Sequence, residues 1–339
     1  MTRPRILYYA HHHGSGHLRH AERFARLGVA EVLVAGTRAG ELRGVDAVAL
    51  EPDDREPHAE PPASPFHWTP RTPAVRRRFA RLHDAMTGFR PDAVLVDVSV
   101  EVACFAALAG YRTALRRMPG ARGDRAHGIA YDAVDRLFAY YPELAEDPAF
   151  AAERRASASW LGMPDPGRAP VRPTAGAAGA VVALVGTGGA GLDGEELARA
   201  ARSTPGRRWI AIGDAAAPAD PPPNLALAGR VPSAAPWLAE AAVIVAGAGH
   251  NTVADVAAAR RPAVLIPEDR PFDEQRAFAR RLRDAVGVPS AERWEDVDDW
   301  PALLAEAEAR PADALARALL VDERGFADAV RGLLERLLG

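Results

Sequence analysis

The stretch that decides the fold is VIVAGAGHNTVADVAAARRPAVLIPEDRPFDEQ, which spans Val243 to Gln275. It begins with an apolar, β-branched run typical of a buried parallel strand, and it continues through a Gly/Ala turn into a predicted helix from about Thr252 to Arg260. A second apolar run, AVLIP, leads through a short loop into another predicted helix that begins near Glu274. This alternation of strands and helices indicates an α/β fold built on a parallel sheet.

The turn before the first of these helices has the features of a phosphate-binding loop. Its glycines allow the backbone to approach an anion closely, and the helix N-terminus offers free N–H groups and the positive end of its dipole. One turn into the helix, the carboxylate of Asp255 is placed to accept hydrogen bonds from ribose hydroxyls. After the second strand, the acidic-amide pair Glu274-Gln275 is suited to binding sugar hydroxyls. The residues expected at the phosphates are Gly247, Gly249, His250, Asn251 and Thr252.

This order of groups resembles the donor-binding region of GT-B nucleotide-sugar glycosyltransferases, the group that includes MurG-like family 28 enzymes and UDP-glucuronosyltransferases. The family pattern joins a Gly-rich loop, an Asn-Thr/Ser pair, an acidic residue, a strand that ends in Pro and an Asp/Glu-Gln pair. The matching residues here are Gly249, Asn251, Thr252, Asp255, Pro267, Glu274 and Gln275. The resemblance also implies that the backbone at Val231 pairs with the nucleobase and that His17 is associated with acceptor activation.

The composition is that of a soluble globular protein with two domains. The chain has 339 residues, 48% hydrophobic and 26% charged, and its net charge of -3 gives no indication of nucleic-acid binding. The chain has no Lys, so its 42 Lys and Arg residues are all Arg, which is typical of a GC-rich bacterial genome. Cys104 is the single cysteine, so no intramolecular disulfide forms, and no apolar run is long enough to cross a membrane. The N-terminus has no signal-peptide apolar region of adequate length, so we expect a cytoplasmic protein, with peripheral membrane contact left open.

The repeated strand-helix pattern predicts two Rossmann-like, doubly wound parallel-sheet domains that face each other across a cleft. Residues 1–159 form the predicted acceptor-binding domain, residues 160–179 a linker rich in Pro, Gly and Ala, and residues 180–339 the predicted nucleotide-sugar-binding domain. In this fold class the last helix often crosses back to the first domain, and 325–338 is the candidate. The Pro-rich segment 51–73 is expected to be a loop over the cleft or an irregular connection.

The first domain begins with a predicted strand over Ile6 to Ala10, followed by the loop HHHGSGH and an amphipathic helix. Gly14 and Gly16 are expected to approach the donor. His17 is the expected general base, because an imidazole with an unperturbed pKa near about 6.5 can take a hydroxyl proton near neutral pH. A histidine base usually has a carboxylate partner, and Asp97, at the end of a central strand, is the best-placed acid. The alternative is that His17 only caps or packs the helix.

The tandem histidines His11, His12 and His13 raise the question of a zinc site. Adjacent histidines at a strand end point in alternating directions, and the chain lacks the HxxxH-plus-Glu arrangement of hydrolytic zinc enzymes. We therefore expect no metal and no cofactor, with the nucleoside diphosphate sugar as substrate. Polar contacts to the sugar, the acceptor or the diphosphate are the preferred role of these histidines.

A second glycine loop follows the first strand of the second domain, where Gly186, Thr187 and Gly188 form another nest suited to phosphate. Two groups of arginines, Arg116 with Arg117 and the cluster Arg76–Arg78, could meet an acidic acceptor. Because arginine is usually solvated, we expect both groups on exposed surfaces.

Together these features predict an inverting, metal-independent glycosyltransferase that moves a hexosyl-type sugar from a nucleoside diphosphate, with UDP expected, to an acceptor hydroxyl. The expected acceptor is a small-molecule natural product or a lipid-linked or cell-envelope glycan. Two alternatives stay open. The first is a nucleotide-sugar epimerase of the UDP-N-acetylglucosamine 2-epimerase type, which shares the architecture, and the second is a homologue that binds a nucleotide sugar without turnover.

Overall fold

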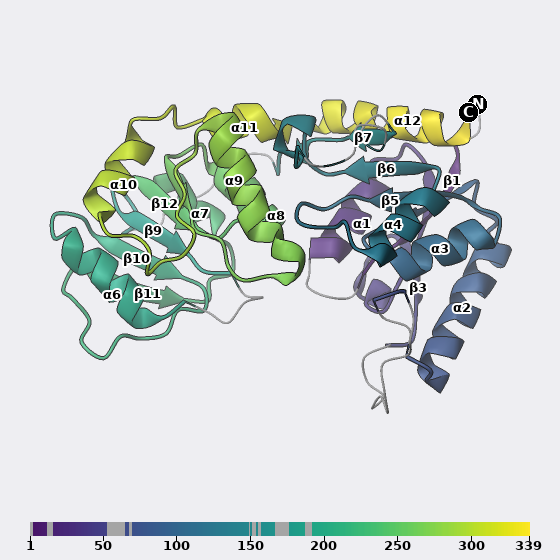
Figure 1. Cartoon of the computed structure of the whole chain (residues 1–339), viewed down its shortest axis with the longest axis horizontal. Helices are drawn as coiled ribbons and strands as arrows, with labels where there is room; N and C mark the ends of the chain where they lie inside the picture. Colours follow the sequence, from purple (N-terminus) through teal and green to yellow (C-terminus); the bar gives the residue numbers. More distant parts are fainter. Residues whose placement is uncertain are drawn as a thin grey trace.

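The structure is a computed structural model that describes residues 3–11, 16–52, 65–67, 70–148, 150, 154, 157–166, 176–186 and 192–339. It consists of two α/β domains, each with one parallel sheet covered by helices (Figure 1). No helix within these ranges is both long and apolar enough to cross a membrane.

The first domain has a seven-stranded sheet in the order β3-β2-β1-β4-β5-β6-β7. The strands are β1 (Arg5–Tyr9), β2 (Glu31–Gly36), β3 (Asp46–Ala49), β4 (Ala93–Val96), β5 (Arg112–Arg116), β6 (Arg136–Ala139) and β7 (Ala158–Trp160). The helical elements are α1 (Gly16–Arg26), η1 (Ala39–Glu41), α2 (Pro73–Phe89), α3 (Val100–Leu108), α4 (Arg125–Ala133) and η2 (Glu143–Ala145). Strand β4 is buried at every position, as expected for an apolar run covered by helices on both faces.

The order of strands creates a topological switch point in this sheet. Strands β1 and β4 are paired neighbours, although β2 and β3 lie between them in the chain. The chain therefore winds in opposite directions on the two sides of this pair. Ligands of open parallel sheets bind outside the carboxyl ends of the strands at such a point.

The second domain repeats this arrangement with a five-stranded sheet in the order β11-β10-β9-β12-β13, so its switch point lies between β9 and β12. The strands are β9 (Val181–Leu184), β10 (Trp209–Ile212), β11 (Leu225–Gly229), β12 (Val243–Ala246) and β13 (Ala263–Leu265). The helical elements are α6 (Gly194–Ser203), α7 (Ala235–Glu240), α8 (His250–Ala259), η3 (Pro271–Asp273), α9 (Glu274–Val286), α10 (Trp300–Glu308) and α11 (Ala314–Leu319).

The end of the chain is part of the first domain's structure. Two-residue strands β8 (Met163–Pro164) and β14 (Leu320–Val321) pair in parallel, and α12 (Glu323–Leu338) follows β14. Helix α12 lies along the first sheet (Figure 1), and its apolar face joins the core around β1, β4 and β5. The residues of α12 in that core are Phe326, Val330, Leu333, Leu334 and Leu337.

The predicted α/β fold with two parallel sheets is confirmed, and one local expectation needs correction. Helix α8 begins at His250, two residues before the predicted start, because Gly249 is extended at φ -64°, ψ 141° and forms the N-cap. The described part of the predicted linker 160–179 contains β8, a strand too short to produce a periodic pattern.

Candidate active site

The first switch point brings a histidine, a carboxylate and an arginine together. Asp97 directly follows β4, and His17 is the second residue of α1, the helix that follows β1. Nδ1 of His17 lies 2.8 Å from Oδ2 of Asp97, and Nη1 of Arg116 donates to Oδ1 of Asp97 at 2.9 Å. Asp97 is completely buried, whereas 18% of the His17 side chain is exposed. Because Nδ1 is engaged by the carboxylate, proton exchange with a substrate would use Nε2 of the ring.

The negative charge of Asp97 is maintained by its partners. Burial alone would raise the pKa of this carboxyl, but Arg116 and His17 outweigh burial and hold its pKa well below the ordinary value. The next residue, Val98, has a φ of 62°, a left-handed conformation that is rare for a β-branched residue. Backbone strain of this kind persists where the surroundings enforce it, and it is concentrated at functional sites.

The prediction that the nearby arginines are solvated is wrong for three of them. Arg116 ends β5 and Arg117 follows it, and both side chains are buried. Arg117 forms its ion pair with Glu146 at 2.9 Å. Arg78, on α2, is also buried and donates to side-chain hydroxyls, while the other two arginines of its cluster are exposed. The three buried guanidiniums all have acceptors, because an unpaired charge inside a protein is very costly.

The second switch point has glycines on both sides and a cavity beyond the strand ends. Gly186 follows β9, and Gly247 follows β12. A Cβ added to Gly186 would lie 3.1 Å from Oε1 of Glu268, and one added to Gly247 would lie 3.3 Å from Oε1 of Gln275. These positions have little room for a side chain, so the backbone itself forms the surface here. Residues lining the cavity include Val185, Gly247, Pro267, Glu268, Arg276 and Trp294.

The N-terminus of α8 meets the N-terminus of α1 across the domain boundary. With Gly249 as N-cap, the free N–H groups of the first turn of α8 belong to His250, Asn251 and Thr252. A Cβ added to Gly16 would lie 2.1 Å from Nδ2 of Asn251, so a side chain at the start of α1 would displace the Asn251 amide. The His17–Asp97 pair of the first domain therefore lies beside the predicted phosphate-binding turn of the second domain.

The side chains of His250 and Asp255 have different surroundings. His250 is buried, its Nε2 donates to the carbonyl oxygen of Tyr140 at 2.8 Å, and burial lowers the pKa of its ring to about 3. This side chain binds the first domain, which leaves the backbone N–H of His250 for the predicted phosphate contact. Asp255 is exposed on α8 and interacts with the charges of Arg19 and Arg23 on α1.

The predicted sugar-binding pair also divides into two environments. Gln275 is buried, and its Oε1 accepts hydrogen bonds from the backbone N–H groups of Ala248 and Glu268, both at 3.0 Å. Its oxygen is therefore committed to holding together the loops that follow β12 and β13. Glu274 instead pairs with Arg122 of the first domain at 2.8 Å.

Comparison with known proteins relates this geometry to a family. Residues 228–293, which contain β12, the turn into α8 and the Glu274-Gln275 pair, match the glycosyltransferase family 28 C-terminal domain. The second domain thus contains a segment that is similar to this family 28 domain. The match spans the predicted donor loop and begins just before Val231, which follows β11. No curated protein sequence matches the chain.

Solved structures share the whole architecture. A glycotransferase of kitacinnamycin has 19% sequence identity and a TM-score of 0.69 over 100% of both chains. Spinosyn rhamnosyltransferase SpnG complexed with thymidine diphosphate has 16% identity and a TM-score of 0.64 over 99% of this chain and 100% of that chain. MurG of Acinetobacter baumannii has 15% identity, 97% and 99% coverage and a TM-score of 0.63. The chain has the GT-B fold, and the family 28 domain within it indicates a glycosyltransferase.

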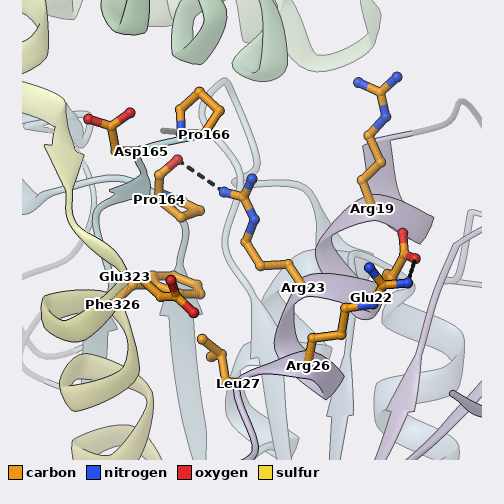
Figure 2. A pocket seen from close by; sticks show the side chains of 10 residues that line it. All are labelled: Arg19, Glu22, Arg23, Arg26, Leu27, Pro164, Asp165, Pro166, Glu323 and Phe326. Atoms are coloured by element: carbon orange, nitrogen blue, oxygen red, sulfur yellow. Dashed lines mark hydrogen bonds and ion pairs between the residues drawn. The ribbon is translucent and has the colours of Figure 1, made fainter. Parts of the chain in front are cut away.

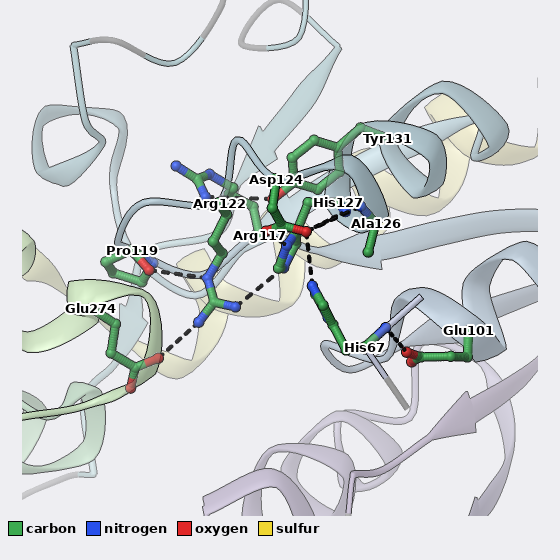
Figure 3. A network of polar contacts seen from close by, with 10 residues as sticks. All are labelled: His67, Glu101, Arg117, Pro119, Arg122, Asp124, Ala126, His127, Tyr131 and Glu274. Carbon is green, nitrogen blue, oxygen red and sulfur yellow. Dashed lines mark hydrogen bonds and ion pairs between the residues drawn. The ribbon is translucent and has the colours of Figure 1, made fainter. Parts of the chain in front are cut away.

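A polar network lies beside the family 28 domain, on the first-domain side of the boundary (Figure 3). Nε2 of His67 and Nδ1 of His127 lie 2.8 Å and 2.6 Å from the two carboxylate oxygens of Asp124. Among the described residues, these three form the one group whose ligand atoms lie close enough for a metal ion. Each nitrogen is hydrogen bonded to its own carboxylate oxygen, and Nη1 of Arg122 lies 3.3 Å from Nε2 of His127. His67, Asp124 and His127 thus form a hydrogen-bonded network beside the guanidinium of Arg122.

A separate cavity lies between α1, α12 and the segment 164–166 (Figure 2). Arg23 crosses it and donates to the carbonyl oxygen of Pro164 at 3.0 Å. Charges of both signs line it, from Arg19, Glu22, Arg23, Arg26, Asp165 and Glu323. Neither switch point contributes to its lining, so we do not count this cavity as part of the candidate active site.

Several predicted residues have no described position, and several site residues were not predicted. Five residues of the prediction lie outside the described residues: His12, His13, Gly14, Thr187 and Gly188. The ring of His11 lies against that of His17, with 5.5 Å between the ring centroids. No sequence pattern identified the network residues His67, Arg122, Asp124 and His127. The one local sequence signal was Asp124, a residue type that favours the N-cap of a helix. Its side chain caps α4 by accepting hydrogen bonds from the backbone N–H groups of Ala126 and His127.

Proposed function

We propose that this chain is an inverting glycosyltransferase that moves a sugar from a nucleoside diphosphate donor to an acceptor hydroxyl. The observation that carries the proposal is the His17–Asp97 pair, which lies at the first switch point and next to the turn into α8. A proton acceptor thereby adjoins the part of the family 28 domain expected to hold the donor diphosphate.

His17 takes the proton of the attacking hydroxyl through Nε2. Asp97 hydrogen bonds to Nδ1, which orients the ring and stabilises the imidazolium that forms. The acceptor oxygen attacks the anomeric carbon as the bond to the diphosphate breaks. A single displacement of this kind inverts the anomeric configuration.

The leaving diphosphate is held by the N-terminus of α8 in place of a divalent cation. Three backbone N–H groups and the positive end of the helix dipole point at the same place, and a partly buried helix terminus stabilises an anion by up to about 2 kcal/mol. Gly247 and Gly249 allow the phosphates to approach this backbone. We therefore expect turnover to continue in the presence of EDTA, and loss of turnover would show a metal requirement.

The donor is UDP-linked or dTDP-linked in this proposal, and the acceptor is a small-molecule natural product or a lipid-linked or cell-envelope glycan. The sequence pattern suggests UDP, and the thymidine diphosphate bound by the rhamnosyltransferase SpnG suggests testing the dTDP series beside it. Trp294 lies in the cavity at the second switch point, where an aromatic ring is available to the donor.

Thermal shift with UDP, dTDP and their glucose conjugates tests donor binding, because a ligand that binds the native state raises the melting temperature. Release of nucleoside diphosphate in the presence of an acceptor panel then tests transfer. Binding followed by acceptor-dependent release supports the proposal. Sugar isomerisation without acceptor would replace it with an epimerase, and failure of all nucleotides to bind would contradict it.

A further inference from the structure

The two domains meet at a tight backbone contact near the predicted sugar-binding pair. The backbone N–H of Ala121, in the loop after β5, donates to the carbonyl oxygen of Phe272 at 2.7 Å. Gly120, at φ 103°, lies so close that an added Cβ would be 2.4 Å from that oxygen and 2.8 Å from Cα of Glu274. A side chain at position 120 would therefore force the domains apart at this point.

The ring of Phe272 lies against the first-domain side chains of His67, Arg122 and His127. Figure 3 shows these three side chains. The ring centroid of Phe272 lies 4.7 Å from Cζ of Arg122, and its distances to the ring centroids of His67 and His127 are 5.3 Å and 5.0 Å. Phe272 and the following Asp273 have φ values of 62° and 53°. Left-handed residues other than glycine are strained, so we infer that these contacts maintain the turn that leads into Glu274.

Arg122 connects this contact to the carboxylate. Its side chain is only 8% exposed, its Nε donates to the carbonyl oxygen of Pro119 at 3.1 Å, and its Nη2 donates to Oε2 of Glu274 at 2.8 Å. A buried guanidinium that is fixed at both ends holds a carboxylate in one orientation. Among the described residues, none donates a hydrogen bond to the other carboxylate oxygen, Oε1 of Glu274.

We propose that Arg122 is a positioning residue for donor recognition: it holds Glu274 so that Oε1 accepts a hydrogen bond from a hydroxyl of the donor sugar. The proposal rests on the proposed function and adds the substrate class. The sugar carries a hydroxyl on the side facing Glu274, and the corresponding deoxy sugar lacks the donor that the carboxylate needs. The sugar site is complete only when the first domain is in contact with the second.

The test compares bare nucleotide with nucleotide sugar, using UDP, dTDP and their glucose conjugates as calorimetric probes. The variants are Arg122→Met, Glu274→Gln, the double variant, and Arg122→Lys, which restores the charge. Arg281→Met is the matched control, because Arg281 lies on α9, the helix that begins at Glu274, and it also bridges the domains by donating to the carbonyl oxygens of Glu146 and Leu144 at 2.8 Å and 3.0 Å.

We expect Arg122→Met to weaken the conjugate about 10- to 100-fold relative to the bare nucleotide, which is the range for a hydrogen bond to a charged group. The double variant should lose no more than the larger single loss, because both changes remove the same interaction. Arg122→Lys should recover part of the affinity, and Arg281→Met should leave the ratio of the two affinities unchanged. If Arg122→Met does not fold, Gly120→Ala tests the same contact from the backbone side and should lower the same ratio.

The outcomes separate this inference from the function on which it rests. If the wild type binds none of the probes, the proposed function fails. If the wild type prefers the conjugate and Arg122→Met keeps that preference, the function stands and Arg122 has no positioning role. Equal losses for nucleotide and conjugate would assign Arg122 to domain closure alone and would also overturn the inference.

Discussion

At the scale of single residues, the candidate site depends on a buried carboxylate with two partners. Asp97 accepts from Arg116 through one oxygen and contacts His17 through the other. Because Arg116 already balances the charge, the main contribution of Asp97 to His17 is orientation. Its hydrogen bond to Nδ1 selects the tautomer in which Nε2 has no proton and can receive one.

The first prediction concerns proton transfer by His17. His17→Gln keeps much of the volume and polarity but cannot accept a proton near neutral pH, so turnover should fall by roughly 10² to 10⁴ with little change in nucleotide affinity. The measurement is nucleoside diphosphate release with acceptor present, between about pH 5 and about pH 9. The wild-type rate should rise with pH as imidazole deprotonates, and the variant should lack this rise. A variant with most of the wild-type rate would exclude His17 as the base.

The second prediction separates the two adjacent buried arginines. Arg116→Leu and Arg117→Leu each leave a buried carboxylate without its partner, so each should lower the free energy of unfolding by roughly 3 to 5 kcal/mol in urea titrations. Only Arg116 contacts Asp97, whereas Arg117 contacts Glu146. Turnover per folded molecule should therefore fall for Arg116→Leu and stay near wild type for Arg117→Leu. Equal turnover of the two variants would mean that Arg116 is only structural.

Some of these residues can be predicted from the sequence and others cannot, for a physical reason. Asp97 was predictable as the partner of His17, because a polar residue at the end of a central apolar strand lies at the carboxyl edge of the sheet. Arg116 also follows an apolar run, but arginine is usually exposed, and its burial depends on the position of Asp97 across the sheet. No local sequence pattern predicts the pairing of Arg116 with Asp97.

At the scale of elements, the central strands were predictable because each is a continuous apolar run. Strand β10 is the apolar run Trp209–Ile212, and β12 is the apolar run Val243–Ala246 that opens the stretch Val243 to Gln275. Strands β8 and β14 could not be predicted, because two residues carry no periodicity. Helix α4 was also not predicted, because it contains Gly128 and depends on Asp124 for its N-terminal cap.

The third prediction concerns the link that Gln275 forms between the loops after β12 and β13. Gln275→Ala leaves the N–H groups of Ala248 and Glu268 without their acceptor, and the loss at the buried Ala248 alone should cost roughly 1 to 3 kcal/mol of stability. Because Ala248 belongs to the predicted phosphate loop, affinity for bare UDP and for its sugar conjugate should fall together. Calorimetry with Glu274→Ala as the control should show loss for the conjugate alone. A selective loss of the conjugate in Gln275→Ala would instead assign the amide to the sugar.

At the scale of the whole molecule, the candidate site exists because the two switch points face each other. Gly16 fits against Asn251, Tyr140 accepts from His250, and Phe272 inserts beside Arg122. Each contact joins residues more than a hundred positions apart, and neither partner has a pattern that identifies the other. One sequence therefore indicates two domains and their separate loops, whereas the details of their contact required the structure.

The last prediction follows from the burial of His250 at this contact. Burial, followed by the charge of Arg116, lowers the pKa of His250 to about 3, below the value of about 6.5 for an unfolded histidine. Between these values the unfolded chain binds the proton and the native chain does not, so the free energy of unfolding decreases as the pH falls. This one group contributes at most about 1.4 kcal/mol per pH unit. The contribution is fully present above about pH 6.5 and is lost as the pH falls toward 3.

His250→Gln tests this contribution, because glutamine also offers an N–H to the carbonyl oxygen of Tyr140 and does not titrate. Urea unfolding of the wild type and the variant, at pH values from about 7 down to about 4, gives the two slopes. The wild type should lose stability more steeply than His250→Gln by up to one bound proton, while carboxyl groups common to both proteins cancel in the difference. Parallel curves would show that His250 is protonated equally in the native and unfolded chains, and hence that it does not form the neutral, buried link between the domains.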